Sequence, residues 1–383
     1  MLTSGIDFTN FKSKKNLILK KKIKLLFKEK NEIIKSLSKN YLFSYNKKNL
    51  KKYFKSTNFR IIGMGGSSLG SKAIYDFLNF KIKKNFLFID NLQTSTKADK
   101  KKNYTNLIIS KSGNTIETII NANILIKPKD KNIFITENKM NYLYKLAEKL
   151  KSEVIHHNNF IGGRYSVLSE VGMLPAELMG LNVNDFKQLN NLVKNKKFIN
   201  ALILNVSSIL YLNKQRKFNS IIINYDEKSE SLFKWYQQLV AESLGKKKKG
   251  LLPIISNMPK DNHSVMQLYL DGFQHNFFTF FYVHEKNSVK INNKDILTSK
   301  KYLKNKNISD VVYAQKQATQ KVFIKRKIPF RSFEIKRKDE KTLGELFCFF
   351  MLETILLGRC LNLNPFDQPA VELVKTQTRK LLL

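Results

Sequence analysis

The stretch Ser110-Lys111-Ser112-Gly113-Asn114-Thr115-Ile116-Glu117-Thr118 constrains the fold more than any other part of the sequence. It follows an apolar run over 106–109 that predicts a buried strand, and it opens a segment with isoleucines at helical spacing. A strand, a hydroxyl-rich turn and a helix bring backbone N–H groups and hydroxyls to the positive end of the helix dipole, which favours a phosphate ligand. The turn matches neither the dinucleotide fingerprint nor a P-loop. The alternative is an ordinary polar turn capped by a threonine.

The composition sets the class of protein. A chain of 383 residues that is 42% hydrophobic is long enough for two α/β domains with cores of their own. The formal net charge is +39, but lysines are spread over almost every segment and are not gathered in a tail or on one helix face. We therefore assign most of them to solvated surface and expect no specific nucleic-acid partner, although such charge favours non-specific adhesion to polyanions at low salt.

Cysteine usage and hydropathy give the expected compartment. The two cysteines, Cys348 and Cys360, match no metal-site spacing and are too few for a disulfide scaffold, which favours a reducing cytoplasm. Residues 1–10 contain no apolar signal core, and the longest apolar run, 346–357, is interrupted by Glu353 and is too short to span a bilayer. We expect a cytoplasmic protein with no membrane partner.

Apolar runs and amphipathic segments alternate in two cycles, and this rhythm predicts an α/β fold with two doubly wound, mainly parallel sheets and helices on both faces. A packing helix over 13–37 and a Lys-rich connection over 41–58 come before the first cycle. The expected strands are 59–62, 85–90, 106–110 and 132–136 in the first cycle, and 220–225, 251–256, 276–283 and 329–336 in the second. The expected helices are 69–80, 231–244, 263–270, 309–325 and 343–357. A helix is also expected after each of the strands 106–110 and 132–136, and a helical linker region is expected over 183–217. We expect a helical N-terminal segment (1–40), two sheet domains (41–180 and 181–360) and a C-terminal tail (361–383).

Two loops are expected to meet at one edge of the first sheet. Gly63-Met64-Gly65-Gly66-Ser67-Ser68-Leu69-Gly70 follows the strand 59–62, as the Ser110 stretch follows its own strand. Glycines there let a ligand approach the backbone closely. In an open parallel sheet, ligands bind at the carboxyl ends of the strands, so these two loops are the expected binding edge.

Two further stretches carry charged residues suited to catalysis. Gly162-Gly163-Arg164-Tyr165-Ser166-Val167-Leu168-Ser169 places an arginine beside flexible backbone, which suits a site that meets developing negative charge; a turn with a surface arginine is the alternative. Gln238-Leu239-Val240-Ala241-Glu242-Ser243-Leu244-Gly245-Lys246 ends an otherwise apolar helix. Taken by itself, Glu242 is interpreted as a salt-bridged helix residue, the usual role of a lone glutamate.

Taken together, these blocks resemble the phosphoglucose isomerase family of the two-domain, sugar-isomerase (SIS) fold. Two later stretches add to the resemblance, namely Asp261-Asn262-His263-Ser264-Val265-Met266-Gln267-Leu268-Tyr269 and Asn364-Pro365-Phe366-Asp367-Gln368-Pro369-Ala370-Val371-Glu372-Leu373-Val374-Lys375. Six blocks lie in family order between residues 63 and 375. The resemblance implies reversible conversion of glucose 6-phosphate and fructose 6-phosphate, as in glycolysis and gluconeogenesis, through ring opening and an enediol(ate), with no metal and no cofactor.

The resemblance also implies a role for each matching residue. Glu242 would be the base that moves a proton between C1 and C2, and Arg164 would stabilise the enediolate. His263 and Lys375 would assist ring opening, and the histidine would come from the partner subunit of a homodimer. The residues implied to bind the substrate are Ser110, Lys111, Ser112, Thr115 and Thr118 at the phosphate, with Gly66, Ser67 and Gln368 at the sugar.

Two positions depart from the family pattern. Asn262 stands where the family usually has Gln, and Val374 stands where it usually has Gly, beside Lys375. Two other functions stay open at this point. One is an isomerase that also accepts mannose 6-phosphate. The other is a non-catalytic sugar-phosphate sensor of the same fold, which would need the phosphate loop but not the four proton-transfer residues.

Overall fold

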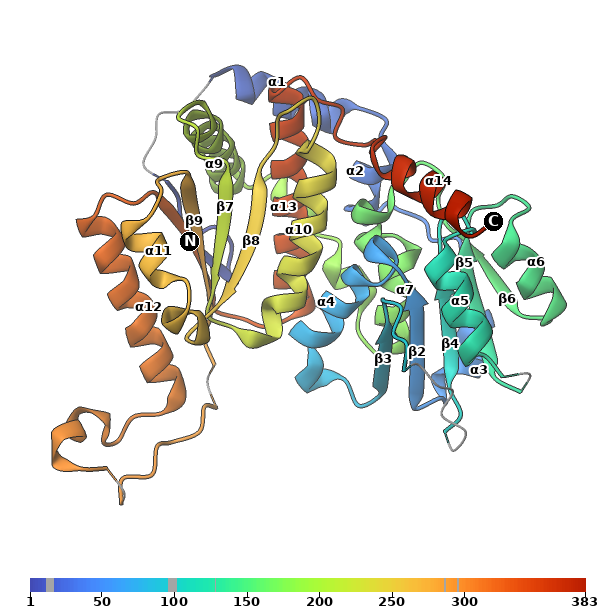
Figure 1. Cartoon of the computed structure of the whole chain (residues 1–383), viewed down its shortest axis with the longest axis horizontal. Helices are drawn as coiled ribbons and strands as arrows, with labels where there is room; N and C mark the ends of the chain where they lie inside the picture. The colour runs from blue at the N-terminus through green and yellow to red at the C-terminus, as the bar shows by residue number, and fades with distance from the viewer. Residues whose placement is uncertain (12–16, 96–101, 128, 286, 295) are drawn as a thin grey trace.

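The computed structural model describes residues 1–383 except 12–16, 96–101, 128, 286 and 295. Two five-stranded sheets lie side by side, and helices cover both faces of each (Figure 1). The two-cycle α/β prediction is therefore confirmed.

The first sheet is wholly parallel and has the strand order β3-β2-β4-β5-β6. Its strands are β2 (Asn58–Gly63), β3 (Asn85–Ile89), β4 (Thr105–Ile109), β5 (Lys131–Thr136) and β6 (Glu153–His156). Within this sheet, β2 is the first strand along the chain, β3 pairs with one side of it and β4 pairs with the other side. The strand order therefore reverses between β2 and β4. Such a switch point is where open parallel sheets bind ligands.

Alternating side chains explain why both faces of this sheet are covered. Ile62 and Ile108 pack against the outer helices, while their neighbours Ile61 and Leu107 belong to a larger core that continues into the second sheet. Both faces are apolar because successive strand residues point to opposite sides and each side has its own helices. The outer helices are α5 (Ile116–Leu125) and α6 (Tyr142–Lys149).

The second sheet has the order β1-β10-β9-β7-β8, and all its pairings are parallel except that of β1 with β10. Its strands are β1 (Ile6–Thr9), β7 (Asn219–Asn224), β8 (Leu252–Asn257), β9 (Asn276–Val283) and β10 (Phe330–Ile335). Helices α11 (Met266–Asp271) and α12 (Ile308–Lys325) contribute to a separate core cluster with β7 and β9. The prediction of mainly parallel sheets is confirmed.

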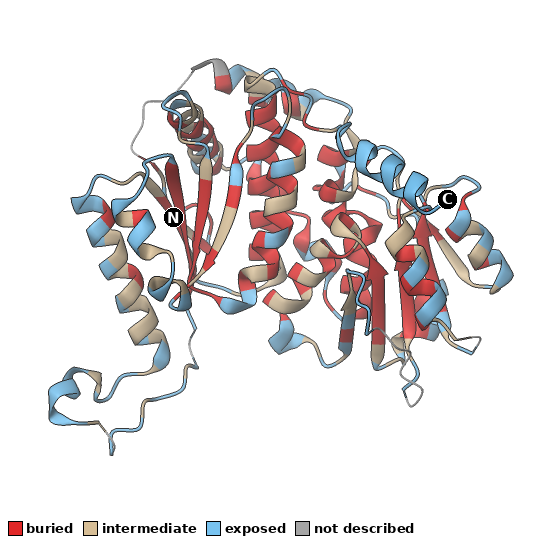
Figure 2. Cartoon of the chain, in the orientation of Figure 1, coloured by how far each residue is buried: buried red, intermediate tan, exposed pale blue. Residues whose placement is uncertain are grey.

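The main core lies between the two sheets. The helices that fill this space are α4 (Leu69–Phe77), α7 (Glu170–Leu178), α10 (Glu230–Leu244) and α13 (Glu340–Cys360). Figure 2 shows α13 almost entirely buried and the C-terminal helix α14 (Val371–Leu381) exposed along its whole length, whereas α12 and α6 mix exposed, intermediate and buried residues. Glu353, which interrupts the apolar run of α13, is fully buried and forms an ion pair with the equally buried Arg331. A buried charge of this kind is tolerated because it is paired and hydrogen-bonded.

The structure corrects two local predictions. The Lys-rich connection over 41–58 is wrong in part, because Asn46 caps a helix, α3 (Lys47–Phe54), whose Leu50 and Tyr53 are buried. The single packing helix over 13–37 is two helices, α1 (Leu17–Lys28) and α2 (Glu32–Ser36), because the Asn31 side chain accepts from the N–H groups of Ile33 and Ile34 and starts a new helix. The part of that prediction over 13–16 lies outside the described residues.

Two edge strands were not predicted. β6 has only four residues, and β1 has four residues that alternate between apolar and polar. The remaining helices are α8 (Leu189–Leu192) and α9 (Lys196–Lys214), both within the predicted linker region. In the part of the chain that the structure describes, no helix is long and apolar enough to cross a lipid bilayer.

Candidate active site

The two predicted loops do meet at the switch point of the first sheet. The glycine loop follows β2 and the phosphate loop follows β4, and these strands are neighbours. The strand ends are so close that a Cβ on Gly63 would lie 2.8 Å from the carbonyl oxygen of Ile109. The expected binding edge is therefore assembled as the sequence suggested.

The phosphate loop is closed by its own hydroxyls. The Ser110 and Thr115 hydroxyls are 2.8 Å apart, and the Gly113 N–H donates to the Ser110 oxygen at 3.2 Å. Gly113 has a φ of +66°, and a Cβ there would collide with the side chain of Asn141. A residue with a side chain would open this turn, which is why the sequence has its one glycine here.

The first-turn N–H groups of α5 are not capped by a side chain of the described residues. Thr115 precedes the helix, but its side chain caps none of the first-turn N–H groups, because it bonds Ser110 instead. The Thr118 hydroxyl is buried and has no hydrogen-bond partner among the described residues. Uncapped N–H groups and an unpartnered hydroxyl at a helix N-terminus suit an anion. The ordinary threonine-capped turn is thus not what the structure shows.

Lys111 and Ser112 complete the phosphate loop. The Lys111 ammonium donates to the Asn159 carbonyl at 2.8 Å and lies 3.6 Å from the Glu137 carboxylate. The Ser112 hydroxyl accepts from the Asn114 N–H at 3.3 Å. Lys111 therefore connects the phosphate loop to the chain segment that leads into the arginine block.

The glycine loop joins the first sheet to the arginine block. It forms a 3₁₀ turn, η1 (Gly65–Ser67), that packs on a second, η3 (Gly163–Leu168). A Cβ on Gly66 would lie 2.2 Å from the Gly163 carbonyl carbon and 2.7 Å from the Arg164 nitrogen. Only a glycine permits this backbone contact, which places Arg164 beside the switch point.

Arg164 is almost fully buried, and hydrogen bonds hold its guanidinium on every side. Its Nε donates to the Ser243 hydroxyl at 2.7 Å, and that hydroxyl also lies 2.9 Å from the Tyr165 hydroxyl. Its two terminal nitrogens donate to Glu242 at 3.3 Å, to Gln368, to the Pro365 carbonyl at 2.7 Å and to the Asp367 carbonyl at 3.0 Å. Arginine stays charged when buried and its planar fork suits several acceptors, so the group is a fixed positive charge.

Glu242 lies in the last turn of α10, and its side chain keeps about a quarter of its surface exposed, 27%. One carboxylate oxygen accepts from Arg164, and the other accepts from Gln238, one helical turn earlier, at 2.9 Å. The Gln238 amide also reaches the glycine loop, where a Cβ on Gly65 would lie 2.7 Å from its nitrogen. A partly exposed carboxylate with both oxygens oriented is arranged to exchange a proton with a ligand at this edge.

A loop from the C-terminal tail closes the cluster. Lys246 donates to the Asp367 carboxylate and to the Asp367 carbonyl, each at 2.5 Å, and to the Asn364 carbonyl. The hydrogen bond from Lys246 holds the pKa of the Asp367 carboxyl below its usual range. We call residues 364–368 the tail loop. Its backbone binds Arg164 and its side chains bind Lys246 and Arg164, so it is attached to the site through these two cations.

The structure does not bring His263 into this cluster. Helix α10 leads through a short loop to the start of β8, whereas His263 belongs to a 3₁₀ turn, η6 (Lys260–His263), that follows the end of β8. Six strand residues span roughly 20 Å, so Glu242 and His263 lie at opposite ends of that strand. His263 is exposed, and its ring has no hydrogen-bond or ion-pair partner in the described part of the chain.

Lys375 is also outside the cluster. It lies on α14, which has no buried residue, and its ammonium pairs with Glu372 at 2.7 Å. Ser67, by contrast, lies in η1 at the binding edge. The structure thus groups ten of the twelve predicted site residues around the switch point and leaves His263 and Lys375 apart. Among the described residues, no group of three or more His, Cys, Asp or Glu side chains could hold a metal ion.

Several residues that shape the site were not singled out from the sequence. Tyr165, Ser243 and Gln238 hold Arg164 and Glu242 in place, and Lys246 and Asp367 hold the tail loop. All five lie within the sequence blocks that the resemblance identified. The sequence therefore showed that these residues lie in the blocks of the site. Their hydrogen-bond partners could not be predicted, because the contacts join segments up to about two hundred residues apart.

Comparison with known proteins identifies the family. A family model described as phosphoglucose isomerase matches residues 45–382. The chain belongs to the phosphoglucose isomerase family. Membership makes it an aldose–ketose isomerase, and the α/β fold described above is that of the SIS-type phosphosugar isomerases. The curated glucose-6-phosphate isomerase of Methanocaldococcus jannaschii is 32% identical over 335 residues, which cover 82% of each chain. That of Acholeplasma laidlawii is 34% identical over 358 residues, which cover 84% of this chain and 82% of the relative.

Solved structures agree with the phosphoglucose isomerase fold. A hypothetical protein from Thermus thermophilus superposes with a TM-score of 0.84 at 22% identity, covering 96% of this chain and 95% of that one. A glucose-6-phosphate isomerase from Chlamydia trachomatis superposes with a TM-score of 0.68 at 18% identity, covering 92% of this chain and 73% of that one. These likenesses establish the fold across nearly the whole chain.

Proposed function

We propose that the protein interconverts glucose 6-phosphate and fructose 6-phosphate, with Glu242 as the base. The observation that carries this proposal is the Glu242 carboxylate held 3.3 Å from the buried Arg164, at the edge that also bears the phosphate loop. A sugar-phosphate sensor needs the loop but has no use for a base and a fixed cation next to it. The paired arrangement therefore favours catalysis over sensing.

Proton transfer is assigned to Glu242. It takes the proton from C2 of the open-chain aldose and returns it to C1, and the aldose becomes the ketose once the hydroxyl proton has also moved from O2 to O1. Gln238 and Arg164 orient the carboxylate, so it does not have to reorganise as the proton moves. Because the same carboxylate releases the proton that it took, a single base serves both directions.

Arg164 is assigned to the enediolate that forms between the two proton transfers. Negative charge develops on a substrate oxygen when the proton leaves carbon. A buried guanidinium stabilises that charge strongly because little water screens it. Its bonds to Ser243 and to the tail loop fix its position before the substrate arrives.

The phosphate is assigned to the loop before α5. Ser110, Lys111, Ser112, Thr115 and Thr118 would supply hydroxyls and one ammonium, and the helix would supply its N–H groups. The unpartnered Thr118 hydroxyl supports this assignment most directly. Gly66, Ser67 and Gln368 would contact the sugar between the loop and Arg164.

Ring opening is assigned to a site shared between two subunits. His263 lies at the far end of β8 from Glu242, so we propose that His263 of one subunit serves the Glu242 site of its partner in a homodimer. Lys375 would assist after α14 moves toward the site. We further propose that the enzyme acts in the cytoplasm without a cofactor, and without a specific nucleic-acid or membrane partner.

Turnover of fructose 6-phosphate to glucose 6-phosphate in the presence of EDTA tests the proposal. Glu242→Gln should lower turnover by roughly 10²- to 10⁴-fold while sugar-phosphate binding stays nearly intact, because it removes a base and keeps the shape. Glu230→Gln, at the other end of α10, is the matched control and should retain activity. If Glu242→Gln weakens binding as much as turnover, Glu242 is a structural residue. An inactive wild type that still binds the sugar phosphate would identify a sensor.

A further inference from the structure

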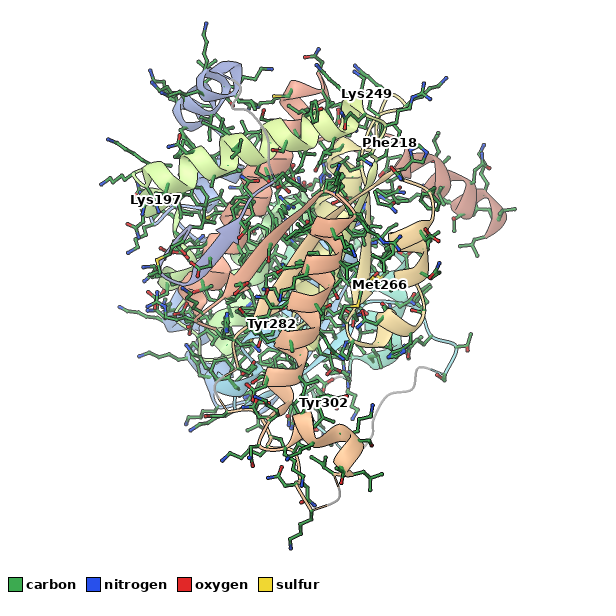
Figure 3. All side chains as sticks on the ribbon, turned by 90° about the vertical axis from the view of Figure 1, so that its left-hand side faces the viewer. Lys197, Phe218, Lys249, Met266, Tyr282 and Tyr302 are labelled. Atoms are coloured by element: carbon green, nitrogen blue, oxygen red, sulfur yellow. The ribbon has the colours of Figure 1, made fainter. Side chains whose placement is uncertain are left out.

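Two adjoining cavities in the second half of the molecule have no part in the proposed reaction. One has a volume of about 500 Å³ and the other about 470 Å³, and both are lined by Lys217, Lys327, Ile328 and Pro329. They lie where α9 and α12 end, at the amino-terminal edge of the second sheet. Figure 3 shows these two helices converging near the labelled Phe218. None of the lining residues belongs to the candidate active site, so the cavities form a separate site.

The first cavity is apolar and has a polar rim. Its walls include Phe11, Tyr211, Ile324 and Phe330. Tyr211 and Ile324 are 56% and 63% exposed, so their side chains present apolar surface at this cavity. The Gln215 amide donates to the Tyr211 hydroxyl at 2.8 Å, which leaves its carbonyl oxygen to accept from a ligand. Aromatic walls beside an amide suit a flat heterocycle.

The second cavity is polar and carries the cations. Arg326 is 3.4 Å from Asp271, its ion-pair partner. Lys217 donates to the Gln274 carbonyl at 2.6 Å, and neither Lys217 nor Lys327 forms an ion pair with any described residue. Partial burial lowers the pKa of Lys217, whereas Lys327 is exposed. An anion between Lys217 and Lys327 would accept charge-assisted hydrogen bonds from both ammonium groups.

The balance of charge around the cavities favours an anion even after the helix ends are counted. Lys217, Arg326 and Lys327 contribute three positive charges, and Asp271 contributes one negative charge. The carboxyl ends of α9, α12 and the short helix α11, which ends at Asp271 beside the second cavity, add about half a negative charge each, which leaves a net charge of about +0.5. The cations thus exceed what is needed to neutralise the three helix ends.

We propose that the two cavities form one binding site for a nucleoside phosphate. The base would lie between Tyr211, Ile324 and Phe330, and the phosphate would lie between Lys217 and Lys327. The combined volume is in the range of ordinary ligand sites. This site is independent of the proposed isomerase function, because it shares no residue with the Glu242 cluster.

Calorimetric titration of the full-length protein with AMP tests this site, with adenosine and inorganic phosphate as the two half-ligands. Saturating fructose 6-phosphate is present throughout, so binding at the candidate active site is excluded. AMP should bind at least about tenfold more tightly than either half-ligand, because it alone occupies both cavities. Lys217→Gln should weaken AMP binding about tenfold, as expected for one charge-assisted hydrogen bond, and should leave adenosine binding unchanged.

Tyr211→Ala is the second variant, and Lys228→Gln is the matched control. Tyr211 is mostly exposed, so its truncation leaves the core intact and should weaken both AMP and adenosine. Lys228 is an exposed lysine of the 3₁₀ turn before α10, and its loss should change nothing beyond a general charge effect. No AMP binding in the presence of fructose 6-phosphate, equal affinity for phosphate and AMP, or equal effects of Lys217→Gln and Lys228→Gln would each overturn the proposal. Isomerase activity measured on the same samples shows separately whether the enzyme is intact.

Discussion

At the scale of single residues, the site depends on one backbone contact. Gly66 touches the Gly163 carbonyl so closely that a methyl group would force the two 3₁₀ turns apart. Gly66→Ala should therefore displace Arg164 and lower turnover by about 10²-fold, the usual cost of a 1 Å misplacement. Gly162→Ala is the control, since its Cβ would meet its nearest neighbour at 4.0 Å and its effect on turnover should be small. Steady-state kinetics and thermal unfolding of both variants check this, and similar loss in the two would contradict it.

At the same scale, some site residues could be predicted from the sequence and others could not. Arg164 and Glu242 could be nominated from residue type and block, because their chemistry suits an enediolate and a base. From the sequence, Gly66 indicated only that a ligand could approach the backbone closely. The requirement for glycine there could not be predicted, because the atoms that a Cβ would meet belong to a segment a hundred residues away. Ser243 and Tyr165 stayed unnoticed because their hydroxyls bond other protein groups: Ser243 bonds Arg164 and Tyr165, and Tyr165 also donates to the Pro365 carbonyl.

At the scale of elements, the tail loop is held to the body by Arg164 and Lys246. Lys246→Gln should loosen the loop, remove acceptors from Arg164, and lower kcat about 10²-fold with a smaller change in KM. Lys246→Arg should restore much of the loss, and Lys234→Gln, on the exposed side of α10, should leave kcat unchanged.

Because the pKa of Asp367 is lowered, its attraction to Lys246 is complete above the ordinary pKa near 4 and is lost only below it. Across pH 5–8 the wild type should thus keep its loop attached, whereas a pH-dependent loss of the Lys246→Arg rescue in that range would argue against the pair.

Element prediction succeeded where burial was continuous and failed where it was partial. Strands buried on both faces, such as β4 and β9, gave unbroken apolar runs and were found within a residue or so. β6 and α3 bury only a few side chains each, so their sequences look like polar connections. A cap such as Asn31 splits a helix without interrupting its apolar spacing, and this explains the two helices seen in place of one.

At the scale of the whole molecule, the separation of His263 from Glu242 underlies the proposal that two chains complete one site. Homodimers of Glu242→Gln and of His263→Ala should each be nearly inactive. When they are unfolded together and refolded as an equal mixture, half of the dimers are hybrids with one intact site, so activity should return to about a quarter of wild type. Refolded single variants are the controls. No recovery in a mixture shown to contain hybrids would mean that each chain supplies its own histidine.

The overall architecture was the most predictable level, whereas the assembly of subunits stays a prediction. Two cycles of strand and helix dictate two wound sheets, because parallel strands need crossover helices. Which end of β8 carries His263 follows from that topology, whereas the expectation that His263 serves a partner subunit came only from the family resemblance.

The tail loop is synthesised long after the arginine that it binds. Arg164 leaves the ribosome some two hundred residues before the carbonyl of Asp367 that it binds. A nascent chain can therefore complete its first sheet, and much of its second, while the cation at the centre of the site still lacks its last partners. Translation that stalls before residue 364 would release a compact polypeptide whose defect lies in function and not in folding, and the growing chain would remain catalytically silent until that loop had emerged.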